Sequence, residues 1–81
     1  MSNLAIIFDF SGNTLTLQCK GNEVIDDVFK RFCVKAQLNI NDVIFYYNST
    51  EMNKTSGKTL DALGVKNLFK FSVVNKSVIG A

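Results

Sequence analysis

The chain contains no histidine and no proline, only two cysteines, and a net charge of only +2 over its 81 residues. Without histidine there is no imidazole to act as a general acid or base, to activate a cysteine nucleophile or to bind zinc. Two cysteines alone cannot complete a structural zinc site or hold an iron–sulfur cluster. An enzyme is therefore the least favoured function class, and we expect no metal and no cofactor.

The positive charge is too small and too scattered to predict a surface for polyanions. Lysines stand singly along the chain, as is typical of a solvated exterior. There is no signal peptide and no apolar run long enough to span a bilayer. We expect neither nucleic acid nor membrane as a partner, and a cytoplasmic or nuclear location.

Apolar residues dominate what is present. The chain is 47% hydrophobic with seven Phe and two Tyr, and it has no low-complexity run, so a folded domain is expected. A chain of 81 residues forms one domain with one core. Cys19 continues the inward series of a strand and Cys33 lies on the apolar face of a helix, so both are predicted as small core residues.

Residues 24–38 form the only long helix that the sequence predicts. Its apolar residues recur at three- and four-residue steps along one face: Ile25, Val28, Phe29, Phe32, Cys33 and Ala36. Asn22 or Glu23 can open this helix, and Lys35 lies near its end, where a positive charge is favoured. A single amphipathic helix must bury this face against the rest of the chain.

Alternating apolar residues predict strands on both sides of the helix. Residues 4–10 and 14–20 alternate and flank a turn at Gly12-Asn13, which predicts a hairpin. After the helix, residues 43–47 predict a third strand and residues 50–52 a very short one.

The last part of the chain predicts a short helical turn and a final strand. Thr59 can cap the turn and Gly64 can end it in a left-handed conformation. Residues 68–75 alternate again as the last strand. The helix is a crossover, so the first and last strands can pair in parallel at the centre of a mixed sheet.

This order of elements, with the run Gly57-Lys58-Thr59-Leu60 before a short turn, resembles ubiquitin and the β-grasp family over nearly the whole chain. The resemblance implies an α+β fold with a mixed sheet of four to five strands packed on one α-helix. Residues 1–76 would be the ubiquitin-like domain and residues 77–81 a flexible C-terminal tail.

Two apolar residues of the third predicted strand do not face the predicted core. In the register that buries Val43, Phe45 and Tyr47, the side chains of Ile44 and Tyr46 point outward. Ubiquitin is recognised largely through an exposed apolar patch on its sheet, and the resemblance places the matching positions at the Phe10-Ser11 turn, Tyr46 and Val74, with Ser72 beside them.

We therefore predict a non-catalytic, monomeric interaction domain, as a module of a longer chain or polyprotein. It would bind other proteins through these residues: Ile44, Tyr46, Ser72 and Val74.

Two alternatives follow from the same resemblance. A ubiquitin-like modifier is conjugated to amines through its tail; Gly80 lies where the terminal glycine belongs, although Ile79 replaces the neighbouring glycine and Ala81 extends beyond it. A self-cleaving intein-like domain could release such a unit. A Ras-association-like domain binds small GTPases by strand addition and expects basic residues on the second strand, where Lys20 is the one candidate.

Overall fold

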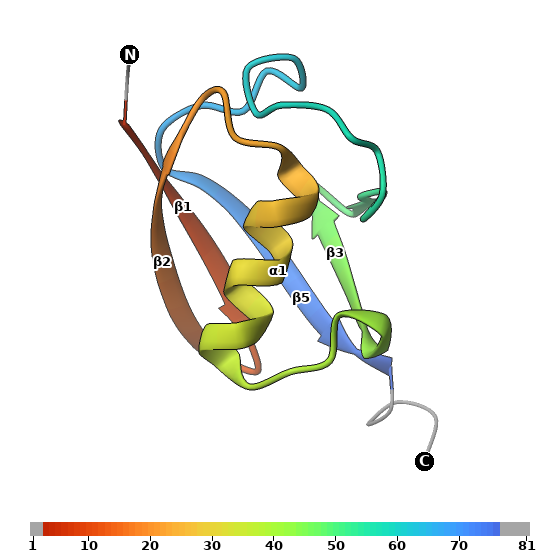
Figure 1. The fold of residues 1–81 in the computed structure, drawn as a ribbon. Helices are drawn as coiled ribbons and strands as arrows, with labels where there is room; N and C mark the ends of the chain where they lie inside the picture. Colours follow the sequence, from red (N-terminus) through yellow and green to blue (C-terminus); the bar gives the residue numbers. More distant parts are fainter. Residues whose placement is uncertain (1–2, 77–81) are drawn as a thin grey trace.

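The computed structural model describes residues 3–76, and they form a five-stranded sheet with one α-helix across one face (Figure 1). The strand order is β2-β1-β5-β3-β4. In chain order the elements are β1 (Asn3–Phe10), β2 (Asn13–Lys20), α1 (Ile25–Ala36), the 3-10 helix η1 (Ile40–Asp42), β3 (Val43–Tyr47), β4 (Thr50–Glu51) and β5 (Phe69–Asn75). The predicted α+β fold, with a mixed sheet packed on one helix, is confirmed.

The hairpin of β1 and β2 turns one residue earlier than the sequence predicts. Phe10 already pairs with Asn13, so the loop consists of Ser11 and Gly12. Their φ values of 52° and 81° are both positive, as a primed two-residue turn requires. The predicted turn at Gly12-Asn13 is wrong because Ser11 takes the left-handed conformation and frees Asn13 for the strand.

The helix opens on backbone contacts instead of the predicted side-chain cap. Val24 occupies the N-cap position and no side chain caps the helix. The Glu23 carboxylate is engaged elsewhere, because it accepts a hydrogen bond from the Lys20 backbone N–H at 2.6 Å. At the other end, Gln37 has a φ of 59° and ends the helix in a left-handed turn.

The parallel pair at the centre of the sheet is confirmed. β1 and β5 run parallel, with Ile6 opposite Phe69 and Phe8 opposite Phe71. The helix returns the chain across one face of the sheet, which makes this pairing feasible (Figure 1). β3 then pairs with β5 in the antiparallel sense.

Aromatic rings fill the space between the sheet and the helix. Five phenylalanines are at most 1% exposed: Phe8, Phe29, Phe32, Phe45 and Phe71. The rings of Phe29 and Phe45 stack with centroids 3.9 Å apart, and those of Phe8 and Phe32 stack at 4.5 Å. The helix is therefore held to the sheet by ring contacts from both layers.

Both cysteines lie in this core as free thiols, as the sequence predicts. Burial raises the pKa of the Cys19 thiol and that of the Cys33 thiol above the ordinary value. For Cys19 the nearby Glu23 carboxylate raises the pKa further, while Arg31 acts in the opposite direction. The thiols therefore stay protonated near neutral pH, and a protonated thiol is a poor nucleophile.

The segment before β5 forms hydrogen-bonded turns. Thr59 Oγ1 accepts a hydrogen bond from the Ala62 N–H at 3.1 Å, as expected of a cap. Gly64 has a φ of 74°, as expected of a left-handed exit. Leu60 is fully buried beneath this turn and Val65 is 5% exposed.

Candidate partner-binding surface

The predicted site residues come from the two neighbouring strands β3 and β5. Side chains of a strand alternate between the two faces of a sheet, so burial of Val43 and Phe45 against the helix turns Ile44 and Tyr46 to the outer face. The same alternation on β5 buries Phe71 and Val73 and leaves Ser72 exposed. Packing of the core thus decides which side chains remain outside.

The register of β3 and β5 brings all the predicted residues together. Ile44 lies directly opposite Val74, and Tyr46 lies directly opposite Ser72. Opposite residues on one face have Cβ atoms about 5 Å apart, so these side chains form one contiguous group. We call Ile44, Tyr46, Ser72 and Val74 the outer-face patch. Its apolar members are half-buried and Ser72 is exposed.

Charged residues lie beside the outer-face patch on the neighbouring strands. Glu51 of β4 lies opposite Tyr46. Asp9 of β1 is in register with Ser72, and its carboxylate pairs with the Lys70 ammonium at 3.7 Å. Sequence reasoning missed both residues: Asp9 reaches the patch through the pairing of β1 with β5, which are distant in the chain, and Glu51 reaches it across the short hairpin of β3 and β4.

Phe10 does not belong to this patch, contrary to what the resemblance implies. It has the same strand parity as the fully buried Phe8, and its half-buried ring packs against the core. Ser11 is an exposed turn residue. The apolar centre of the outer-face patch therefore consists of residues from β3 and β5.

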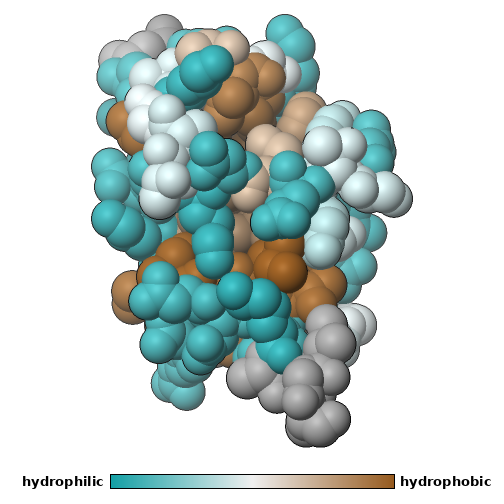
Figure 2. All heavy atoms as spheres, turned by 90° about the vertical axis from the view of Figure 1, so that its right-hand side faces the viewer, coloured by the Kyte–Doolittle hydropathy of each residue, from teal (hydrophilic) through white to brown (hydrophobic). Residues whose placement is uncertain are grey.

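The side of the molecule on which β3 lies is mixed in polarity. Figure 2 shows hydrophobic surface on this side, interrupted by hydrophilic side chains. A mixture of this kind is typical of protein surfaces as a whole.

Within residues 3–76, no group of three or more His, Cys, Asp or Glu side chains is arranged to hold a metal ion. In the same range no helix is long and apolar enough to cross a membrane.

The two alternative functions depend on Gly80 and on Lys20. Gly80, on which conjugation through the tail depends, lies outside the described residues. Lys20, predicted as the basic residue for a GTPase, ends β2, and its backbone N–H and C=O are both bonded to Glu23. Strand addition at Lys20 itself would have to displace these bonds.

In comparisons of sequence, no family model and no curated protein matches the chain. Comparison of structures does find similar folds. The ubiquitin of Caldiarchaeum subterraneum superposes with a TM-score of 0.79 at 22% identity, covering 91% of this chain and 94% of its own. A ubiquitin-like domain of an Arabidopsis thaliana protein gives a TM-score of 0.83 at 16% identity, covering 100% of this chain and 85% of its own.

A third similar structure is ATBAG1, solved in complex with HSP70. It gives a TM-score of 0.77 at 14% identity and covers 89% of this chain but 40% of its own. At sequence identities of 14% to 22%, these comparisons show a common fold and nothing more.

Proposed function

We propose that this chain, whose fold is the ubiquitin-like β-grasp, is a non-catalytic interaction domain that binds other proteins through the outer-face patch. The observation that carries the proposal is the register that sets Ile44 opposite Val74 and Tyr46 opposite Ser72. Residues 1–76 would be the binding domain, with residues 77–81 as a tail. The domain would act as a monomer within a longer chain or polyprotein, in the cytoplasm or nucleus.

The composition of the patch suits a binding surface. Tyrosine supplies a large, rigid contact area with a hydroxyl at its tip, and it is enriched among the residues that dominate binding energy. Ile44 and Val74 extend the apolar area beside it, while Glu51 and Asp9 supply a polar border. A partner with an apolar centre and a polar rim would be complementary.

The patch is also preorganised. Its residues alternate along β3 and β5 with buried neighbours that hold both strands against the helix, among them Phe45 and Phe71 at 0% exposure. A surface held in this way gives up little conformational freedom on binding, so more of the contact energy remains as affinity. ATBAG1, a chain that contains a similar fold, was solved in complex with HSP70, which is consistent with a role in protein recognition.

The test is a comparison of the proteins retained by the full chain and by its Tyr46→Ala variant, using quantitative mass spectrometry. Tyr46 is half-buried on the outer face, so truncation should cost about 1 kcal/mol of folding free energy or less. Loss of a central aromatic anchor should weaken partner binding about tenfold or more. Tyr46→Phe, which keeps the ring, should retain most of the binding.

Lys66→Ala is the matched control, because Lys66 is exposed in the turn before β5. It should retain the same proteins as the unchanged chain. If Tyr46→Ala remains folded by circular dichroism and retains an unchanged set of proteins, the proposed function is wrong.

A further inference from the structure

Residues 52–57, which we call the strap, run along the outer edge of β3. The two residues of β4 pair only with Tyr46 and Tyr47, at the end of β3. In the part of the chain that the structure describes, no strand pairs with the outer edge of β3 at Val43 and Phe45. An uncovered strand edge can pair with another chain, so folded proteins usually cover such edges.

Two donors from the strap cover the backbone carbonyls of this edge. The Met52 N–H donates to the Phe45 carbonyl at 2.7 Å. The Lys54 ammonium donates to the Val43 carbonyl at 2.7 Å and to the Ile40 carbonyl of η1 at 2.8 Å. Val43 and Phe45 are two positions apart, so their carbonyls point to the same edge. The Lys54 ammonium therefore occupies the place that a donor of a further strand would take.

Few other contacts hold the strap. The Gly57 N–H donates to the Asp26 carboxylate of the helix at 2.9 Å. Met52 is the one large apolar residue of the strap, and it packs against the core. A hollow of about 460 Å³ is lined by residues 51–55 alone, so the strap is loosely packed. Segments with few buried apolar contacts open locally at a lower free energy than the core.

A local turn directs the Lys54 side chain inward. Asn53 Oδ1 accepts hydrogen bonds from the Thr55 N–H at 2.9 Å and from the Thr55 hydroxyl at 3.0 Å. Asn53 and Thr55 are exposed, whereas Lys54 between them is half-buried. Within residues 3–76 the ammonium makes no ion pair, and the two carbonyls stabilise its charge instead. Hydrogen bonds from a charged donor are about twice as strong as neutral ones, so Lys54 is the strongest polar anchor of the strap.

One of the two buried thiols lies near Lys54. Burial raises the pKa of the Cys33 thiol on α1, and the Lys54 ammonium acts in the opposite direction, which requires its charge to lie near the sulfur. Cys33 is 3% exposed. Cys19 lies on β2, at the opposite side of the sheet from β3, and its charged neighbours are Glu23 and Arg31. The two thiols therefore report on two different parts of the molecule.

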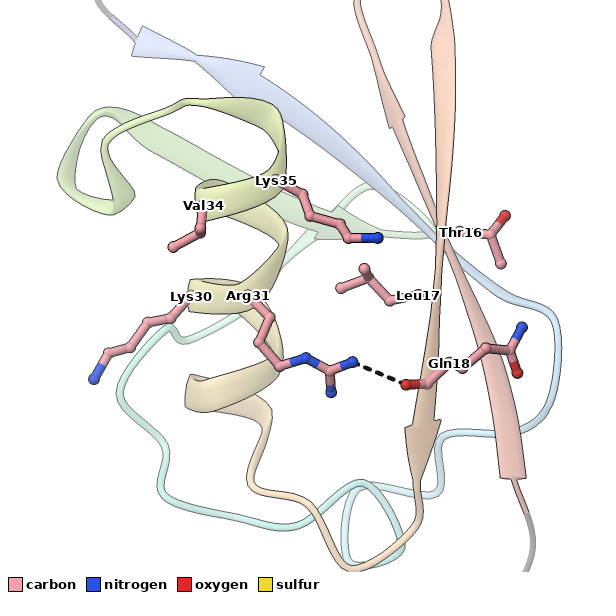
Figure 3. Close-up of a pocket in the computed structure, with 7 residues that line it drawn as sticks. All are labelled: Thr16, Leu17, Gln18, Lys30, Arg31, Val34 and Lys35. Carbon is pink, nitrogen blue, oxygen red and sulfur yellow. Dashed lines mark hydrogen bonds between the residues drawn. The ribbon is translucent and has the colours of Figure 1, made fainter.

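At the β2 side of the sheet, the corresponding cation comes from the helix. Arg31 Nη2 donates to the Gln18 carbonyl of β2 at 2.9 Å (Figure 3). The helix and β2 also border a hollow of about 530 Å³, with Leu17 and Val34 among its lining residues. Arg31 belongs to a helix that is fixed by its buried face, whereas Lys54 belongs to a loop. The cation at the β3 edge can therefore move away while the core stays folded.

We propose that the strap is a gate on the β3 edge and that Lys54 holds it closed. The closed strap keeps other chains from pairing with this edge. When the two hydrogen bonds of the Lys54 ammonium break, the strap opens locally, frees the backbone of Val43 and Phe45 and lets solvent reach Cys33. β3 stays paired with β5 along its other edge, so the outer-face patch is unchanged. The gate does not depend on the function proposed for that patch.

The test is the rate at which iodoacetamide alkylates each thiol of the folded full chain, followed by peptide mass spectrometry. This rate follows the population of the open state when reclosing is fast. Lys54→Met keeps a long side chain but removes both hydrogen bonds, so alkylation of Cys33 should become about tenfold faster or more, with Cys19 unchanged. Loss of the charge alone would raise the thiol pKa and slow alkylation, so a faster reaction reports opening.

Lys58→Met is the matched control. Lys58 is exposed directly after the strap, and in the described range its side chain makes no hydrogen bond, so both alkylation rates should stay the same. Amide hydrogen exchange gives a second readout. In Lys54→Met the amides of Val43 and Phe45, which face the strap, should exchange faster, whereas that of Ile44, which faces β5, should not change. Lys54→Arg, which keeps a charged donor, should restore most of the protection of Cys33.

Three results would overturn the proposal. One is an unchanged alkylation rate of Cys33 in Lys54→Met. Another is an equal increase at Cys19, which would show that the whole domain had lost stability instead of opening at the strap. The third is an equal increase in Lys58→Met, which would assign the effect to the net charge of the chain. The result of the Tyr46→Ala comparison affects none of these.

Discussion

Replacement of Phe45 by leucine tests whether ring contacts hold the helix to the sheet. Phe45 is fully buried, and its ring lies 3.9 Å from that of Phe29, 5.8 Å from that of Phe32 and 6.0 Å from that of Phe8, measured between centroids. Each well-oriented aromatic pair contributes about 0.5 to 1.5 kcal/mol beyond the area it buries. Phe45→Leu removes all three pairs while keeping an apolar side chain.

The expected loss is about 2 to 4 kcal/mol of unfolding free energy, because leucine leaves part of the ring volume empty. A domain of this length has a total stability of about 4 to 12 kcal/mol, so the variant should remain folded over most of this range. Urea unfolding followed by far-ultraviolet circular dichroism measures the difference.

Phe69→Leu is the matched control. Phe69 is half-buried at the rim of the core, where its ring stacks on Tyr47 at 4.0 Å and meets Phe71 edge-on at 5.6 Å. Exposure to solvent reduces the cavity cost, so this variant should lose about 1 to 2 kcal/mol. If Phe45→Leu costs no more than Phe69→Leu, the stacked rings are not what joins helix and sheet.

Two further predictions concern strain and titration. Leu68 has a φ of 66° and is 64% exposed. Leu68→Gly should raise the free energy of unfolding by about 0.5 to 1 kcal/mol, because the left-handed strain that it relieves exceeds the entropy cost of glycine. A lower urea midpoint for the variant would contradict this. Burial raises the pKa of both thiols, so the unfolded chain loses its thiol protons first as pH rises. Their contribution to stability is complete below the ordinary thiol pKa of about 8.5 and declines above it. The decline in urea midpoint should be shallower in a Cys19→Ala, Cys33→Ala double variant, and equal slopes would contradict the assignment.

Much of the fold could be predicted from local patterns. Apolar residues at helical spacing placed Phe29 and Phe32 on the buried face of the helix, and alternation placed Ile44 and Tyr46 on the opposite face of the sheet from Phe45. Local details were less secure. Ser11 has a left-handed backbone conformation, which the residue type serine does not predict. The Glu23 carboxylate accepts hydrogen bonds from the Lys20 N–H and from Arg31, and it does not cap the helix.

For the candidate site, local patterns predict the direction of a side chain but not its neighbours on other strands. The sequence alone determined that Ile44, Tyr46 and Val74 do not belong to the core, because the direction of a side chain follows from backbone period and the burial of its neighbours. Only the tertiary structure decided that Ile44 faces Val74 and that Leu17 and Val34 border one hollow. These contacts join residues far apart in the chain, so they depend on strand register and on how the helix crosses the sheet, which only the packing of the whole core fixes.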